Sequence, residues 1–194
     1  MKTKYFTQPF FSFVPRSTGF YLVAFVFACS LSSYAQEIIW ASKVDKYSSQ
    51  VGTSSFSAKQ ILGKPNARPD STGNGWQPHG TQREEFIVVE FDTIVKSKQI
   101  LIVESMNTGY IRKVSAFDNQ GMEYDVAHFP AKSGMKGPKL LKINVADFSI
   151  NIKSVKVTLV PLRHVPTTVD AVGITASDED FMLTKNMEII AQVK

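Results

Sequence analysis

The chain has 194 residues, of which 43% are hydrophobic, and its formal net charge is +5. This length suits one domain with a full core plus a short extra segment, and it is short for two domains. Loss of the N-terminal segment described next removes Lys2, Lys4 and Arg16, which lowers the net charge from +5 to +2. The remaining cations alternate with acids, which does not indicate a nucleic-acid partner.

The first 35 residues have the order of a secretory signal peptide. Cations without any acid precede an apolar run at residues 21–28, and Ser33 and Ala35 are the small residues that a signal peptidase accepts. The apolar run is too short to span a bilayer core of roughly 30 Å as a helix. We therefore expect cleavage before Gln36 and export to the periplasm, the outer-membrane surface or the extracellular space.

A lipoprotein signal is the alternative interpretation of the same segment, with Cys29 acylated and kept as an anchor. Phe27 is unfavourable just before such a cysteine, whereas the Ser-x-Ala site is good, so plain secretion is favoured. Cys29 is the only cysteine, so no disulfide can form within the chain. An exported fold must then be stable through its core.

The first part of the mature chain is poor in strand pattern. Residues 57–62 predict a short helix with Ser57 as its cap, ended by Gly63 and Pro65. A loop rich in Pro, Asp, Ser, Gly and Asn follows, and Trp76 is its single large aromatic residue.

Short strands then follow at regular intervals. Apolar and polar residues alternate, for example Met122, Tyr124 and Val126 against Glu123 and Asp125, which indicates strands with one buried face. The predicted strands are 85–91, 98–104, 111–117, 122–129, 139–145, 153–160 and 168–175.

This pattern predicts an all-β fold, an antiparallel jelly-roll sandwich of about seven to eight strands with one short N-terminal helix. We expect the sandwich to occupy residues 36–176. Residues 177–194 form a C-terminal tail that fits a helix, a last strand or a linker, and the sequence does not decide among these.

Consecutive connections in a sandwich fall at alternate ends, so the longer loops should gather at one end. That end receives residues 67–84, 105–110, 130–138 and 161–167, and we regard it as the candidate binding face. Lys132 and Lys136 belong to it. The candidate ligand contacts on it are Trp76, His79, Arg83, Asn107, Tyr110, Arg163 and His164.

Two of these residues could have a structural role in place of ligand contact. Trp76 offers a flat apolar surface on which a sugar ring could stack, but large aromatic residues are usually buried, and a Trp capping the core is the favoured alternative. Asn107 stands where a left-handed turn residue is wanted, which favours a turn role over ligand contact.

Asp170 shares strand parity with Val172 and Ile174 and should therefore point inward. A buried carboxylate must be paired or hydrogen-bonded, so we expect it to accept bonds from loop N–H groups or from an arginine. Glu104, at the end of its strand, invites the same structural interpretation.

Metal and catalytic sites have weak support. His79, His128 and His164 lie near the candidate end, but no short paired spacing indicates a metal site. The stretch from Asp118 to Gly121 resembles a calcium loop only faintly and is typical of a hairpin turn. No catalytic motif or cofactor-binding loop is found, so we expect neither catalytic residues nor a cofactor.

Several short motifs, taken in order, resemble a known family. They are WASKV from Trp40, YSSQ from Tyr47, SAKQILGKPN from Ser57, WQP from Trp76, EFI from Glu85, ESMNTG from Glu104 and VDAVGI from Val169. The set resembles the galactose-binding-like β-sandwich module of discoidin or coagulation factor 5/8 C-terminal type. It is similar to bacterial envelope proteins that carry this module ahead of a peptidoglycan-binding outer-membrane domain.

The resemblance implies a non-catalytic, exported module that recognises a glycan or a glycosylated envelope component. Two alternatives stay open, a structural module that docks onto an envelope protein without binding sugar, and a hydrolase with scattered catalytic residues.

Overall fold

The computed structural model describes residues 38–66, 74–80, 82–130, 137–178 and, for the backbone, 188–193. The predicted export segment, Cys29, Lys132 and Lys136 lie outside these residues. Across the described residues, no helix is both long enough and apolar enough to cross a membrane.

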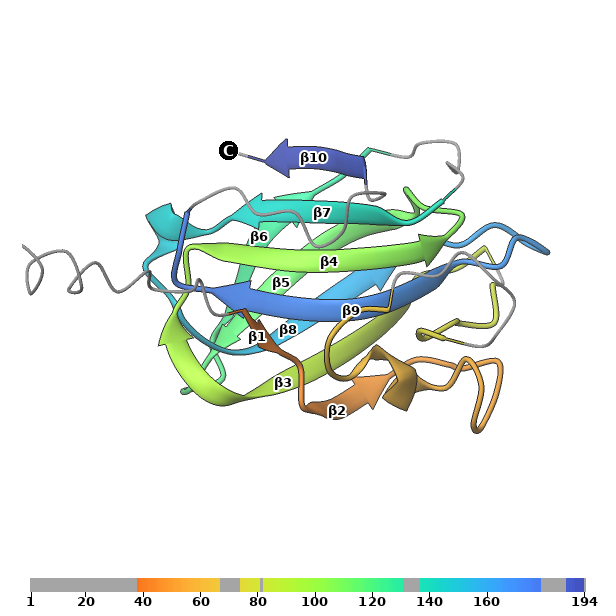
Figure 1. Ribbon diagram of the computed structural model, residues 1–194, viewed down its shortest axis with the longest axis horizontal. Coiled ribbons are helices and arrows are strands. Elements are labelled where there is room, and N and C mark those ends of the chain that lie inside the picture. Colours follow the sequence, from red (N-terminus) through yellow and green to blue (C-terminus); the bar gives the residue numbers. More distant parts are fainter. Residues whose placement is uncertain (1–37, 67–73, 81, 131–136, 179–187, 194) are drawn as a thin grey trace, which may run out of the picture. The chain divides into compact units, whose positions relative to one another are not determined.

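The described residues form ten strands in two five-stranded sheets. The two sheets face each other (Figure 1). The first sheet has the order β1-β9-β4-β7-β10 and the second β2-β3-β8-β5-β6. Neighbouring strands are antiparallel, except that β10 runs parallel to β7. The strands are β1 (Ile39–Trp40), β2 (Lys43–Tyr47), β3 (Glu85–Lys96), β4 (Gln99–Met106), β5 (Ile111–Asp118), β6 (Glu123–His128), β7 (Lys139–Asn144), β8 (Asn151–Leu159), β9 (Thr168–Thr175) and β10 (Glu188–Val193).

The predicted all-β sandwich is confirmed, and each of the seven predicted strands is present as β3 to β9. Strands β1 and β2 were not predicted, and β10 lies in the tail, for which a last strand was one of the three alternatives. The predicted helix is a single 3-10 turn, η1 (Ala58–Ile61), and a second one, η2 (Ala146–Phe148), follows β7. Ser57 precedes η1 but makes no capping bond; the Ala58 N–H instead donates to Gln50 Oε1 at 2.9 Å.

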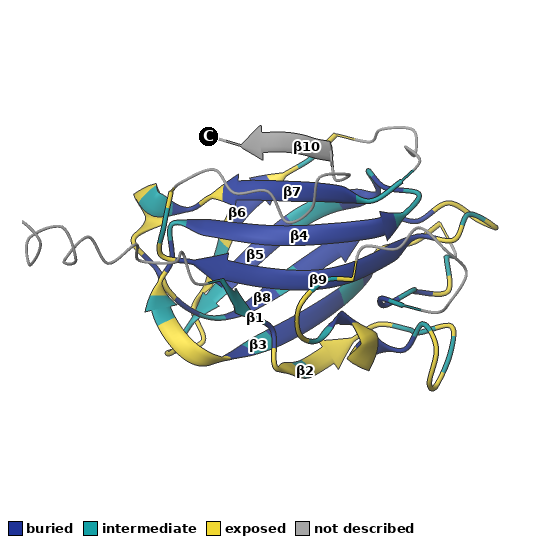
Figure 2. Ribbon diagram, in the orientation of Figure 1, coloured by how far each residue is buried: buried dark blue, intermediate teal, exposed yellow. Residues whose placement is uncertain are grey.

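The core lies between the two sheets, and the central strands are coloured as buried along most of their length (Figure 2). Fully buried members include Ile87, Val89, Ile102, Val157 and Val172. Each such side chain stabilises the fold by about 1.5–3 kcal/mol through removal of apolar surface from water. A core of this kind removes the need for a disulfide.

The outward face of the first sheet is buried as well. The sequence pattern predicted one buried face and one solvent-exposed face for each strand, so this second buried face is a difference. Leu101, Val103, Leu140 and Ala171 form a second apolar cluster, against which Trp40 packs. The cluster explains why β4 and β9 have hardly any exposed residue.

The loops gather at one end as predicted. In the second sheet, Glu85 and Ile111 both lie opposite Leu159, and in the first sheet Met106 lies opposite Thr168. The loops before β3, after β4 and after β8 therefore leave the sandwich at the same end. We call this the loop end.

The hairpin between β5 and β6 is a turn, as the sequence predicts. Asp118 Oδ1 accepts hydrogen bonds from the N–H groups of Gln120 and Met122, and Tyr124 donates to Oδ2 at 3.1 Å. Gly121 has a positive φ of 84°, the left-handed conformation that favours glycine. The carboxylate that a calcium loop would use is thus engaged within the turn.

Candidate functional site

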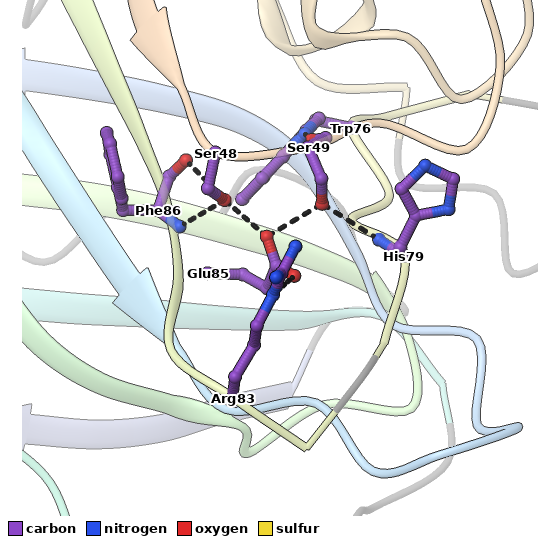
Figure 3. A network of polar contacts seen from close by, with 7 residues as sticks. All are labelled: Ser48, Ser49, Trp76, His79, Arg83, Glu85 and Phe86. Atoms are coloured by element: carbon purple, nitrogen blue, oxygen red, sulfur yellow. Dashed lines mark hydrogen bonds and ion pairs between the residues drawn. The ribbon is translucent and has the colours of Figure 1, made fainter.

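A buried carboxylate, Glu85, organises the loop end (Figure 3). It begins β3 with the inward parity of Ile87 and has no exposed surface. Its Oε2 accepts hydrogen bonds from the hydroxyl groups of Ser48 and Ser49, the latter at 2.7 Å, and its Oε1 accepts from Arg83 Nε at 3.1 Å. Glu85 thus satisfies the requirement that a buried charge be both paired and hydrogen-bonded.

These contacts set the ionisation of the site. Burial raises the pKa of Glu85, but hydrogen bonds from Ser48, Ser49 and Arg83, together with the charge of Arg83, outweigh burial, so the pKa lies below its usual range. Glu85 is therefore an anion at neutral pH. The Arg83 side chain keeps 65% of its surface exposed, so the ion pair has its anion inside and its cation at the surface.

The two serines extend this network to three segments of the chain. Ser49 Oγ accepts from the His79 N–H at 3.1 Å, and the Ser49 carbonyl accepts from Trp76 Nε1 at 2.8 Å. Ser48 Oγ accepts from the Phe86 N–H at 2.9 Å. The end of β2, the loop before β3 and the start of β3 are fixed to one another through Glu85 and its two serine donors.

Further contacts join the other loops of this end. The Trp76 N–H donates to the Val169 carbonyl at 2.8 Å, and Asn107 Nδ2 donates to the Pro166 carbonyl at 2.6 Å. A β-carbon added at Gly80 would lie 3.4 Å from the Leu162 carbonyl oxygen, so the loops before β3 and after β8 are neighbours. The loop end is thus a set of mutually braced loops.

The structure corrects two of the predicted ligand contacts. Trp76 is fully buried in the core, so its ring is not a platform for a sugar; it has the alternative role of a Trp that closes the sandwich. Tyr110 is also buried, with 3% of its surface exposed, so its ring is not available to a sugar either. Asn107 has a φ of 42°, which agrees with a turn role.

The remaining predicted contacts are exposed at the loop end. They are His79, Arg83, Arg163 and His164. His128 lies on β6, with its Nε2 3.8 Å from Asp125 Oδ2. In the part of the chain that the structure describes, no group of three or more His, Cys, Asp or Glu side chains could hold a metal ion.

Asp170 lies inside, as its parity indicates, with 3% of its surface exposed. Its Oδ2 accepts the Asn66 N–H at 2.9 Å, which ties the segment after η1 to β9. This is the structural role expected from the sequence, acceptance of a loop N–H by a buried carboxylate.

Glu104 has a comparable place at the end of β4, with 1% of its surface exposed. Its two carboxylate oxygens lie 3.1 and 3.3 Å from the Gly109 nitrogen, whose N–H they accept. Burial raises the pKa of Glu104 to about 7, although the N–H groups of Gly109 and Tyr110 and the charge of Arg112 act in the opposite direction. The carboxyl therefore holds its proton more strongly in the folded chain than an exposed glutamate does.

Sequence reasoning missed Glu85, Ser48 and Ser49. Parity could have found Glu85, because it alternates with Ile87 and Val89 just as Asp170 alternates with Val172. Nothing in the serine pair itself predicts its partner, since the acceptor lies more than thirty residues away along the chain.

The role of Asp170 can be tested by stability. Asp170→Ala leaves the Asn66 N–H without its acceptor and should lower the free energy of unfolding by about 1 to 3 kcal/mol. Asp170→Asn keeps an acceptor oxygen and should cost less. Asp147→Ala, which changes an exposed acid of η2, is the control in urea melts. Identical midpoints for wild type and Asp170→Ala would show that Asp170 does not brace the fold.

The raised pKa of Glu104 predicts a pH dependence of stability. The folded chain binds the proton more tightly than the unfolded chain, whose carboxyl has the ordinary value of 4.5. The free energy of unfolding should therefore fall as pH rises from about 4.5 to about 7, by roughly 3 kcal/mol at most. Glu104→Gln should remove this fall, whereas Glu84→Gln at an exposed position should keep it. Urea melts at several pH values measure both, and an equal pH dependence in Glu104→Gln and wild type would contradict the prediction.

Comparison with known proteins gives structural likeness only. No family model matches the sequence, and no curated protein matches it at a significant level. A chain in the crystal structure of reduced XRCC1 bound to the DNA polymerase β catalytic domain is similar, with a TM-score of 0.55 and 11% identity over 73% of this chain and 100% of that one.

Two further structures share the fold. Allantoicase from Saccharomyces cerevisiae has a TM-score of 0.53 and 17% identity, covering 72% of this chain and 43% of that one. A pectin-binding carbohydrate-binding module has a TM-score of 0.50 and 12% identity, covering 79% and 99%. At such identities the likeness establishes fold and leaves function to the site. The chain therefore has the jelly-roll β-sandwich fold that these structures share.

Proposed function

We propose that the protein is a non-catalytic binding module that recognises an acidic glycan through its loop end. The observation that supports this most directly is the orientation of Arg83 by the buried Glu85, at 3.1 Å from Nε to Oε1. The rest of the guanidinium group is available to solvent. A guanidinium fixed in this way offers paired N–H donors that match the two oxygens of a carboxylate.

The exposed ionisable side chains around Arg83 are mostly basic, although the buried Glu85 offsets the charge of Arg83 itself. The ionisable residues of the described loop positions 74–84 and 161–167 are two arginines, two histidines and one acid, Glu84. Arg163 and His164 follow Leu162, the residue whose carbonyl lies next to Gly80. The aromatic side chains expected to stack on sugar, Trp76 and Tyr110, are buried, so hydrogen bonds to a charged group are the better-supported mode of recognition.

The fold is compatible with this function, since a pectin-binding carbohydrate-binding module has it. Fold alone does not assign function, so the proposal depends on Arg83. The segment at residues 1–35 predicts export, which would place the module where extracellular and envelope glycans occur. Retention by a lipid on Cys29 is the alternative mode of localisation.

One observation favours docking onto a protein as a second candidate function. Two large apolar side chains, Val51 and Leu162, are 45% and 44% exposed. Both belong to the loop end, because the Val51 N–H donates to the Gln77 carbonyl at 2.9 Å. An apolar pair beside cations suits a protein surface better than a sugar.

The test is calorimetric titration of the mature protein with oligogalacturonate, an acidic oligosaccharide, and with its methyl-esterified form, which lacks the charge. We expect binding of the acid form only. Arg83→Ala should weaken it about tenfold or more, because a charge-assisted pair is lost, and Arg83→Lys should recover part of the loss. Lys96→Ala, which removes an exposed cation of β3 far from its loop-end start, is the control.

Equal binding by Arg83→Ala and wild type would overturn the proposal, as would equal binding of the charged and esterified forms. Absence of binding together with co-purification of a protein partner, lost on Leu162→Ser, would support docking instead.

A further inference from the structure

A groove crosses the outer face of the second sheet, on a different surface from the loop end. Its volume is about 530 Å³, and β2, β3, β5, β8 and the hairpin after β5 contribute residues to it. This volume lies within the range of roughly 300–1,000 Å³ that is typical of small-molecule sites. Residues of three adjacent strands, β3, β8 and β5, line the groove, so a ligand several units long can contact more than one of them.

Two half-buried phenylalanines line this groove. Phe86 of β3 lies opposite Thr158 of β8, and Phe117 of β5 lies opposite Ser154 of the same strand. Four residues along β8 and two strand spacings separate the two positions, a diagonal of about 16 Å. The two rings are therefore placed as separate apolar contact points for a ligand several units long.

Lys156 lies between the two rings. On β8, Lys156 is paired with Val88 of β3 on one side and with Ser115 of β5 on the other. Its Nζ is 5.3 Å from the centre of the Phe86 ring, within the range of a cation–π contact. The middle of the groove thus offers a hydrogen-bond donor beside an apolar surface.

The charges that line the groove nearly balance. Three lysines and two aspartates contribute to it, namely Lys46, Lys153, Lys156, Asp45 and Asp118. A polyanion or a polycation would gain little net attraction here.

The lysines also have acidic neighbours already. Lys153 Nζ lies 3.9 Å from Glu90 Oε2, and Lys156 Nζ lies 3.9 Å from Glu123 Oε1. A ligand with alternating donors and acceptors but no charge fits this lining best. A sugar has such hydroxyl groups, and its C–H faces suit aromatic rings.

We infer that this groove binds a strand of neutral polysaccharide, with a sugar ring on Phe117 and hydroxyl groups bonded around Lys156, whose ammonium group lies over the Phe86 ring. The site differs from the loop end in both face and chemistry, so it goes beyond the proposed function. One contact links the two, since Ser48 Oγ accepts the Phe86 N–H while it donates to Glu85. Ser48 thus joins the backbone at Phe86 to the loop end.

The test is an amide-detected NMR titration of the mature protein with three neutral hexasaccharides, cellohexaose, xylohexaose and mannohexaose. At least one should bind, and the largest shifts should fall on the amides of Phe86, Phe117 and Lys156. Phe117→Ala should weaken that binding about tenfold, because the stacking contact is lost. Phe148→Ala, at an exposed Phe of η2 outside the groove, is the matched control.

Different results would contradict the inference and the proposed function, because the two sites bind different ligands. Phe117→Ala should leave binding of oligogalacturonate unchanged, because Phe117 lies on β5 and has no contact with the described residues of the Glu85 network. Absence of binding by all three hexasaccharides would overturn the inference. So would shifts confined to the loop end, or stronger binding of oligogalacturonate than of neutral sugar at the groove. The wild-type shifts decide this even if Phe117→Ala does not fold.

Discussion

A carboxylate with no exposed surface must find all its hydrogen-bond donors inside the protein, and Glu85 finds them at the loop end. Two come from serines at the end of β2 and one from Arg83, two residues before it. The same serines accept N–H groups from His79 and Phe86. Removal of this anion would take the shared acceptor from Ser48, Ser49 and Arg83 at once, so the position of the loop before β3 depends on it.

The two candidate surfaces follow from the position of β3. Because successive side chains of a strand point to opposite faces, Glu85 enters the end of the core and Phe86 faces the outer groove. Arg83, just before the strand, reaches solvent while bound to Glu85. One short stretch of sequence therefore orients a cation at the loop end and an aromatic ring on the sheet. Orientation of this kind lowers the entropic cost of binding, because the groups need little further ordering.

The predictable part of this structure is the part that depends on local alternation. Strands β3 to β9 and the inward position of Asp170 follow from parity, and the hairpin at Asp118 follows from turn chemistry. Strand β2 was missed because it is an edge strand with the polar sequence KVDKY and mostly exposed residues. Strand β10 was left undecided because its pairing with β7 is parallel and non-local.

The site was harder to predict because its contacts join distant segments. The burial of Trp76 depends on Ser49 and Val169, which come from opposite ends of the domain sequence. Composition of a polar loop gives no sign of this convergence. The exposed arginines of the loop end could be predicted because the order of the loops alone places them there. The groove could not be predicted, because its lining depends on the pairing register of β3 and β5 on β8.

The central claim is that Glu85 acts on ligand binding by orienting Arg83. A double-mutant cycle with Glu85→Gln and Arg83→Ala, read out as the affinity for oligogalacturonate with folding verified for each variant, tests it most directly. The account predicts that Glu85→Gln weakens binding severalfold in the presence of Arg83 and has almost no effect once Arg83 is alanine. Wild-type affinity in Glu85→Gln, or losses that simply add in the double variant, would contradict the account.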